Sequence, residues 1–159
     1  MRISANQFIA GLTVLVSFWS VFSTSAQTVH YVNVSGTCGG QTPCYTSIQT
    51  AVNTAASGDT IRLATGSYGA GAVTIPTSGL IIDIPSGATG FSFTLNAGIA
   101  KLQLMGAGAV NVTGNDAVNS LTGNDGVNNY NSKKGADTIY AEGGNDVITA
   151  DMTWTLQNQ

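Results

Sequence analysis

Carboxylate side chains gather near the C-terminal end of this chain of 159 residues, in a segment rich in glycine. Glycine lets the backbone turn sharply enough to aim its carbonyl oxygens inward, and a carboxylate adds a charged oxygen to them. Oxygen shells of roughly six to eight donors are what Ca²⁺ prefers, so calcium binding is the chemistry to expect here. Six of the eight acidic residues belong to this segment: Asp116, Asp125, Asp137, Glu142, Asp146 and Asp151.

The same segment repeats with a period of nine residues over 105–149, as MGAGAVNVT, GNDAVNSLT, GNDGVNNYN, SKKGADTIY and AEGGNDVIT. The eighth position is always apolar: Val112, Leu121, Tyr130, Ile139, Ile148. The sixth position becomes Asn and then Asp: Val110, Asn119, Asn128, Asp137, Asp146. The fourth position holds small turn residues: Gly108, Ala117, Gly126, Gly135, Gly144. A fixed period with these residue types predicts a parallel β-roll.

These repeats resemble the calcium-binding nonapeptide (RTX) family, whose consensus is G-G-x-G-x-D-x-U-x with an inward apolar residue at U. The resemblance implies that each ion lies between turns two repeats apart on one side of the roll. The turn of Asn119 would then face that of Asp137, and the turn of Asn128 that of Asp146. The resemblance also implies that the turns of Gly126, Gly135 and Gly144 contribute carbonyl oxygens. Asp116 and Asp125 take the third position, where they could reach an ion or face water.

Some repeats depart from the consensus. Asn119 and Asn128 are neutral, and Ser132, Lys133 and Lys134 replace glycines at the start of the fourth repeat. A neutral amide loses the ionic attraction and two ammonium groups oppose it, so we expect low affinity. The alternative is a metal-free roll in which Asn119 and Asn128 stack as a hydrogen-bonded ladder.

Upstream elements must position this roll. Ile48, Ala51, Val52 and Ala55 recur at helical spacing, Thr46 and Gln49 stand at capping-box spacing, and Gly58 is suited to end the helix. After it, short alternating patterns predict strands. Their apolar residues are Ile61, Leu63, Val73, Ile75, Ile82, Ile84, Phe91, Phe93, Leu95, Leu102, Leu104, Val110 and Val112.

Residues 46–68, TSIQTAVNTAASGDTIRLATGSY, resemble the opening of right-handed parallel β-helix proteins of the pectate-lyase-like superfamily. The resemblance implies a short helix that plugs the open end, a Gly-Asp-Thr-Ile turn into the first strand and a Gly-x-Tyr that closes the coil. Such a cap is needed because the first coil would otherwise expose apolar side chains and unpaired backbone groups.

The N-terminus predicts export. A charged start, an apolar run over residues 8–22 and small residues up to Ala26 are typical of a secretory signal peptide cleaved after Ala26, and the run is short for a membrane span. A retained membrane anchor is the alternative. In an oxidising compartment Cys38 and Cys44 are expected to form a disulfide.

Charge limits the possible functions, since only 8% of residues are charged and five are Lys or Arg. A nucleic-acid binder needs a basic surface, so none is expected. Arg62 and Asp83 could serve a polysaccharide lyase, although a solvated strand residue is the simpler interpretation of Arg62. His30, the only histidine, implies no hydrolytic triad. Ice binding would need threonines at matched positions on successive coils, and only Thr113 and Thr122, with Thr149 further on, come near that.

We therefore expect an all-β, right-handed parallel β-solenoid with a short capping helix. Its parts would be a signal peptide (1–26), a disulfide loop, capping helix and β-helix coils (27–104), an RTX-like roll (105–149) and a C-terminal cap or truncated end (150–159). The expected function is calcium binding in a bacterial secreted or cell-surface protein, structural or adhesive and without catalysis of its own. The alternative is a reduced or truncated polysaccharide-lyase-like module acting on acidic glycans. Expected partners are calcium ions and extracellular or cell-surface polysaccharide, with no nucleic acid and no membrane span after cleavage.

Overall fold

The computed structural model describes residues 26–151. The predicted signal peptide lies outside the described residues except for Ala26, as do residues 152–159 of the predicted C-terminal cap. No helix within residues 26–151 has the length and hydrophobicity needed to span a membrane.

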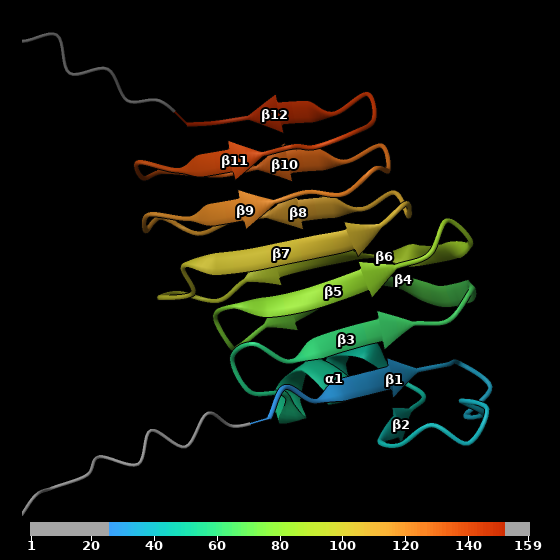
Figure 1. Ribbon diagram of the computed structural model, residues 1–159. Helices are drawn as coiled ribbons and strands as arrows, with labels where there is room; N and C mark the ends of the chain where they lie inside the picture. The colour runs from blue at the N-terminus through green and yellow to red at the C-terminus, as the bar shows by residue number, and fades with distance from the viewer. Residues whose placement is uncertain (1–25, 152–159) are drawn as a thin grey trace, which may run out of the picture.

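The described chain winds into a stack of coils with two parallel β-sheets as its walls (Figure 1). Sheet A has the order β11-β9-β7-β5-β3-β1-β2, and sheet B has the order β12-β10-β8-β6-β4. Sheet A contains β1 (Val29–Val32), β2 (Cys44–Tyr45), β3 (Thr60–Leu63), β5 (Leu80–Ile84), β7 (Lys101–Gly106), β9 (Ser120–Thr122) and β11 (Thr138–Tyr140). Sheet B contains β4 (Gly66–Ile75), β6 (Ala88–Leu95), β8 (Asn111–Thr113), β10 (Asn129–Asn131) and β12 (Val147–Thr149). The predicted all-β parallel solenoid is confirmed.

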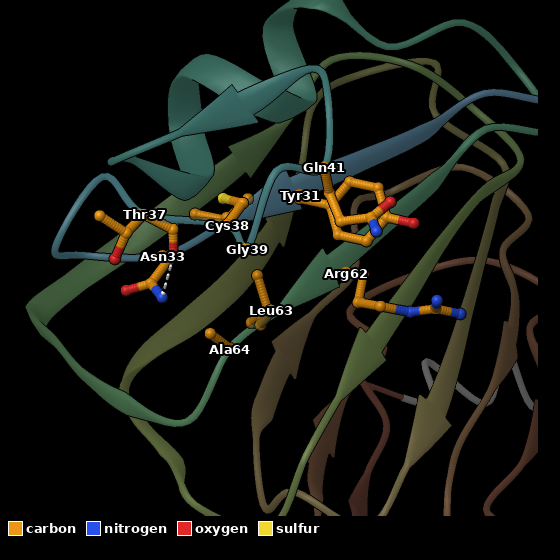
Figure 2. A pocket seen from close by; sticks show the side chains of 10 residues that line it. Tyr31, Asn33, Thr37, Cys38, Gly39, Gln41, Arg62, Leu63 and Ala64 are labelled. Atoms are coloured by element: carbon orange, nitrogen blue, oxygen red, sulfur yellow. Dashed lines mark hydrogen bonds between the residues drawn. The ribbon is translucent and has the colours of Figure 1, made fainter.

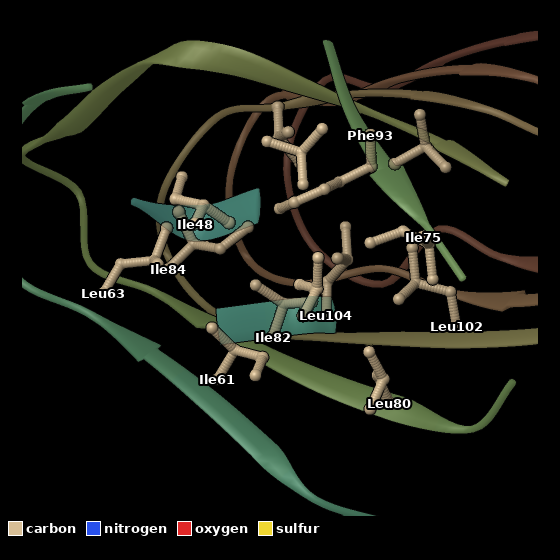
Figure 3. Close-up of a cluster of buried hydrophobic side chains, with 14 of the residues drawn as sticks. Ile48, Ile61, Leu63, Ile75, Leu80, Ile82, Ile84, Phe93, Leu102 and Leu104 are labelled. Carbon is tan, nitrogen blue, oxygen red and sulfur yellow. The ribbon is translucent and has the colours of Figure 1, made fainter. Parts of the chain in front are cut away.

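Alternation along each strand builds the core between the sheets. Because successive side chains of a strand point to opposite faces, every second residue enters the interior. In β5 this buries Leu80, Ile82 and Ile84. Side chains of successive coils stack there in columns, with Phe93 and Ile75 of sheet B opposite the residues of sheet A (Figure 3). Burial of this apolar column against its neighbours is what stabilises each coil.

A short helix, α1 (Ile48–Thr54), covers the N-terminal end of the stack (Figure 1). Its apolar face, Ile48, Ala51 and Val52, is buried in the core. The N-cap is Ser47, whose hydroxyl accepts a hydrogen bond from the Thr50 backbone N–H, so the expected start at Thr46 was wrong by one residue. The last helical residue is Thr54, and the C-cap is Ala55, which has extended backbone. Gly58, the expected end of the helix, has a positive φ of 89° but belongs to the turn that follows.

The segment between β1 and β2 is a loop closed by the Cys38–Cys44 disulfide, which confirms the predicted pairing. Hydrogen bonds hold its ends, from the Tyr31 N–H to the Pro43 carbonyl at 3.0 Å and from the Asn33 amide to the Thr37 carbonyl at 2.8 Å. The loop is therefore fixed beside the outer face of sheet A.

The nine-residue period corresponds to half a coil of the stack. Tyr130 of β10 pairs with Val112 of β8 and Ile148 of β12, while Leu121 of β9 pairs with Ile139 of β11. Partners are 18 residues apart, so successive repeats fall on opposite sheets and every second repeat returns to the same sheet. The predicted inward positions are confirmed, although Ile148 in the last described coil is exposed. The expected boundary between residues 104 and 105 falls inside β7, and the sheets continue across it.

Candidate functional site

The candidate cation-binding residues lie at two opposite corners of the C-terminal coils. The first corner contains the stacked turns 114–119 and 132–137, and the second contains the turns 123–128 and 141–146. The Asn119 backbone N–H donates to Asp137 Oδ1 at 2.9 Å in the first corner. The Asn128 N–H donates to Asp146 Oδ1, also at 2.9 Å, in the second. The turns expected to face each other do so.

Glycine is required where these turns approach each other. A Cβ atom at Gly135 would collide with the Ala117 carbonyl oxygen, and one at Gly144 would collide with the Gly126 carbonyl. Both glycines also have positive φ, 121° and 108°. A Cβ at Gly126 would meet the Gly108 carbonyl of the coil below. The three predicted glycines therefore stand where the carbonyl oxygens of the neighbouring turn leave no room for a side chain.

Asparagine amides already occupy the lower turns of the first corner. Asn119, fully buried, donates from Nδ2 to the Ile99 carbonyl and to Asn115 Oδ1, both at 3.0 Å. Asn115 donates in turn to the Ile99 carbonyl at 2.8 Å and to the Asn96 carbonyl. The Ile99 carbonyl thus accepts from both side-chain amides, so no ion is needed to satisfy it.

The second corner repeats this arrangement. Asn128 donates to Asn124 Oδ1 at 2.7 Å, and Asn124 donates to the Gly108 carbonyl at 3.1 Å. Asn119 and Asn128 thus lie at opposite corners, each with its own network, and the idea that they stack as one ladder was wrong. The reason is that nine residues make half a coil, which places successive repeats on opposite sides.

Two buried hydroxyls near these corners lack partners. Within the described residues, Ser132 Oγ and Tyr130 Oη are the buried side-chain oxygens without a hydrogen-bond partner. Ser132 lines one hollow with Gly135 and Asp137 at the first corner. Tyr130 Oη lies against Gly123 at the second corner. Burial raises the Tyr130 pKa to about 12, and the nearby Asp146 carboxylate adds to the shift. The upper turn of the first corner therefore holds Asp137 and the unsatisfied Ser132 hydroxyl. At the second corner the Asp146 carboxylate of the upper turn acts on the Tyr130 hydroxyl, which comes from β10 and lies against Gly123 of the lower turn. Carboxylate and hydroxyl oxygens are donors that suit a hard cation.

Charge distinguishes the two corners. The first contains Asp116 and Asp137 together with Lys133 and Lys134, so its charges cancel. The second contains Asp125, Glu142 and Asp146 and has no basic residue. Asp116 and Asp125 are exposed, although Asp125 Oδ1 lies 3.0 Å from the place where a Cβ would stand on Gly143. In the part of the chain that the structure describes, no three acidic, His or Cys side chains converge on one point.

A buried polar cluster beneath the coils was missed by sequence reasoning. His30 Nε2 lies 3.1 Å from Asp59 Oδ2, and His30 Nδ1 lies 3.3 Å from the Tyr45 hydroxyl. Thr54 on α1 donates to the Tyr45 hydroxyl at 3.0 Å. The cluster ties the capping helix to the first two strands. The only feature of the sequence that pointed to this cluster was the Gly-Asp-Thr-Ile turn, which contains Asp59.

A column of threonines runs along the outer face of sheet B, and the sequence pointed only to its members Thr113 and Thr149. Thr74, Thr94 and Thr113 are paired neighbours on β4, β6 and β8, and Asn131 and Thr149 continue the column on β10 and β12. Thr122, which the sequence placed with them, lies on sheet A. The column is hidden in the sequence because the coils between Thr74 and Thr113 are longer than those of the nine-residue repeat.

Arg62 and Asp83, the expected lyase residues, form an ion pair on the outer face of sheet A, with Arg62 Nε 2.8 Å from Asp83 Oδ2. The pair engages the guanidinium that the lyase alternative assigns to the base. Comparison with known protein families, curated proteins and solved structures gave no match to this chain.

Proposed function

We propose that this chain is a calcium-binding structural or adhesive solenoid of an exported protein, without catalysis of its own. The observation that carries the proposal is a carboxylate near a buried hydroxyl at each corner: Asp137 with the unpartnered Ser132 in the upper turn of the first corner, and Asp146 with Tyr130, which lies between the two turns of the second. An unsatisfied buried hydroxyl costs about 1–3 kcal/mol, so a donor set left open in this way favours a ligand.

The lower turns support the same proposal. Their amide networks satisfy the carbonyls of the coil below, which leaves the upper turns as the places where a cation would add stability. Asp146 and Tyr130 would hold the ion at the second corner, with the Gly126 and Ala141 carbonyls close by. At the second corner, bound calcium would supply positive charge between two turns whose acidic residues repel each other. The function would then be mechanical, since the ion would fasten successive coils.

The charges rank the two sites. At the second corner three acidic residues have no basic neighbour, whereas at the first corner two lysines oppose the two aspartates. Coulomb attraction to a divalent cation is therefore stronger at the second corner. We expect Asp146 to matter more for calcium binding than Asp137.

Thermal melting of the chain, followed by circular dichroism in Ca²⁺ or in chelator, tests the proposal. For a site of the weak extracellular kind, about 10 mM Ca²⁺ is on the order of 10–100 times the Kd. Binding at that level stabilises by about 1.4–2.7 kcal/mol, or several degrees in Tm for a chain of this size. Asp146→Asn should remove most of that shift and Asp137→Asn, the matched control, much less. No shift at this concentration refutes calcium binding.

The lyase alternative stays a prediction, and no contact among the described residues favours it. Incubation of the chain with polygalacturonate, followed by measurement of unsaturated products, tests it. The Arg62→Ala variant would be the control, because the alternative assigns the base to this residue.

A further inference from the structure

A hollow of about 360 Å³ lies between the disulfide loop and the outer face of sheet A. It is at the opposite end of the stack from the first and second corners of the C-terminal coils. Figure 2 shows Thr37, Cys38 and Gly39 of the loop on one side and Tyr31 and Arg62 on the other, with Leu63 at the end of β3 and the following Ala64 below the loop. Its volume is within the range of small-ligand sites, at the lower end.

Register brings three complementary side chains to this face. Tyr31 on β1 pairs with Arg62 on β3, and Arg62 pairs with Asp83 on β5, so all three lie in one outward column. The Arg62 guanidinium carbon is 6.0 Å from the centre of the Tyr31 ring. The Arg62 side chain is 49% exposed and that of Asp83 25%, so both remain open to a ligand. The column thus offers an aromatic face beside a planar donor and a carboxylate acceptor.

The loop that completes the hollow is preorganised. The Cys38–Cys44 disulfide closes it, and the Gln41 N–H donates to the Cys38 carbonyl at 3.0 Å. Asn33 bonds both to Thr37 and to the backbone N–H of Ser35. The exposed Gln41 lines the hollow. A ligand that binds here does not have to order the loop, and this lowers the cost of association.

From this arrangement we propose that the hollow binds a neutral hexopyranose unit of a polysaccharide. A pyranose has an apolar C–H face, which suits the Tyr31 ring, and a rim of hydroxyls, which suit paired donors and acceptors such as Arg62–Asp83 and the Gln41 amide. The ion pair at 2.8 Å leaves the column without net charge. Arg62 lines the hollow, but its charge is already paired with Asp83, so an acidic sugar would gain no net attraction and we expect a neutral one.

The site does not depend on the proposed calcium function. Its residues lie on β1, β3, β5 and the disulfide loop, and none belongs to the first or second corner of the C-terminal coils. Sugar binding should therefore be the same in Ca²⁺ and in chelator. Failure of either proposal would leave the other standing.

Affinity electrophoresis of the chain in native gels tests the proposal, with hydroxyethylcellulose, galactomannan or polygalacturonate in the gel. We expect one of the neutral polymers to retard the native chain and polygalacturonate to have no effect. Tyr31→Ala should lower the apparent affinity for that polymer by about tenfold or more. Arg62→Ala should lower it as well.

Tyr140→Ala is the matched control, because Tyr140 is a 60% exposed tyrosine on the same sheet far from the hollow. It should be retarded like the native chain. If Tyr31→Ala does not fold, Gln41→Ala in the exposed loop replaces it, with a loss of binding expected. Three results would overturn the proposal: no retardation by either neutral polymer, retardation by polygalacturonate alone, or equal losses in Tyr31→Ala and Tyr140→Ala.

Discussion

Replacement of Asp59 by asparagine should strongly destabilise the N-terminal end of the solenoid. The Asp59 residue is only 6% exposed. Its carboxylate accepts hydrogen bonds from the backbone N–H groups of Thr28 and Ala56, both at 2.9 Å, and lies 3.1 Å from His30 Nε2. Asparagine has the same shape, but one of its two oxygens becomes an NH₂ group. At least one of these donors would then face another donor in a buried place.

The magnitude follows from these contacts. A hydrogen bond to a charged group contributes about 1.5–3 kcal/mol, and a buried donor left without an acceptor costs about 1–3 kcal/mol. Because the three contacts share one carboxylate they are not additive, and we expect a loss of about 3 kcal/mol in the free energy of unfolding. Asp83→Asn breaks the half-exposed pair with Arg62 and should cost about 1 kcal/mol or less.

The effect should depend on pH. Burial raises the pKa of Asp59, but hydrogen bonds from Thr28, Ala56 and His30 outweigh it and leave the pKa below its ordinary value. A carboxylate with a depressed pKa stabilises the fold above its unfolded pKa of about 3.9, and this stability is lost as the pH falls through the folded pKa. The difference between the native chain and Asp59→Asn should be full near neutral pH and shrink below about pH 4.

Urea unfolding at several pH values, followed by circular dichroism, measures these differences. The carboxylate is not the anchor that we describe if Asp59→Asn costs no more than Asp83→Asn at neutral pH. A difference that grows toward acid pH would contradict the direction of the pKa shift.

Two further predictions concern the C-terminal coils. Spectroscopic titration of the tyrosines in alkali should reveal a late step near pH 12 that Tyr130→Phe abolishes. Because the folded pKa of Tyr130 exceeds the unfolded value of about 10, the stability of the fold should be lost as the pH rises through that step. A titration curve unchanged by the substitution would contradict the burial of this hydroxyl. Gly144→Ala should cost more than about 1 kcal/mol in thermal or urea unfolding, because its φ is 108° and its Cβ would strike the Gly126 carbonyl. The control Gly71→Ala points into open space and should change stability by less than about 0.5 kcal/mol, so equal losses in the two variants would refute the close approach of the turns.

Local patterns were sufficient to predict most of the architecture. Alternation predicted the strands because a strand buries every second side chain, and the nine-residue period predicted stacked half-coils because each apolar residue recurs at the same place in a turn. The disulfide followed from two cysteines in a short loop. The cap was displaced by one residue, since neighbouring hydroxyls at Thr46 and Ser47 are equivalent in sequence and only the backbone at Ser47 decides between them.

The candidate sites were less predictable, because their members come from different coils. Asp137 and Asp146 were found through the repeat, whereas Tyr130 and Ser132 looked like a core residue and a substituted glycine. The partner of His30 lies 29 residues away and could not be inferred from spacing. No repeat relates Tyr31, Arg62 and Asp83, because the coils of the N-terminal half differ in length.

By itself the sequence determined which residues point inward, where the chain turns and that its coils stack in parallel, because these follow from side-chain periodicity and glycine geometry within one coil. Only the tertiary structure decided which outward residues become neighbours. Lateral register depends on the length of every intervening turn, and a difference of one residue moves a side chain to the opposite face. For this reason the core of the solenoid could be predicted from the sequence, while the threonine column, the His30–Asp59 anchor and the hollow beside Tyr31 emerged only from the folded chain.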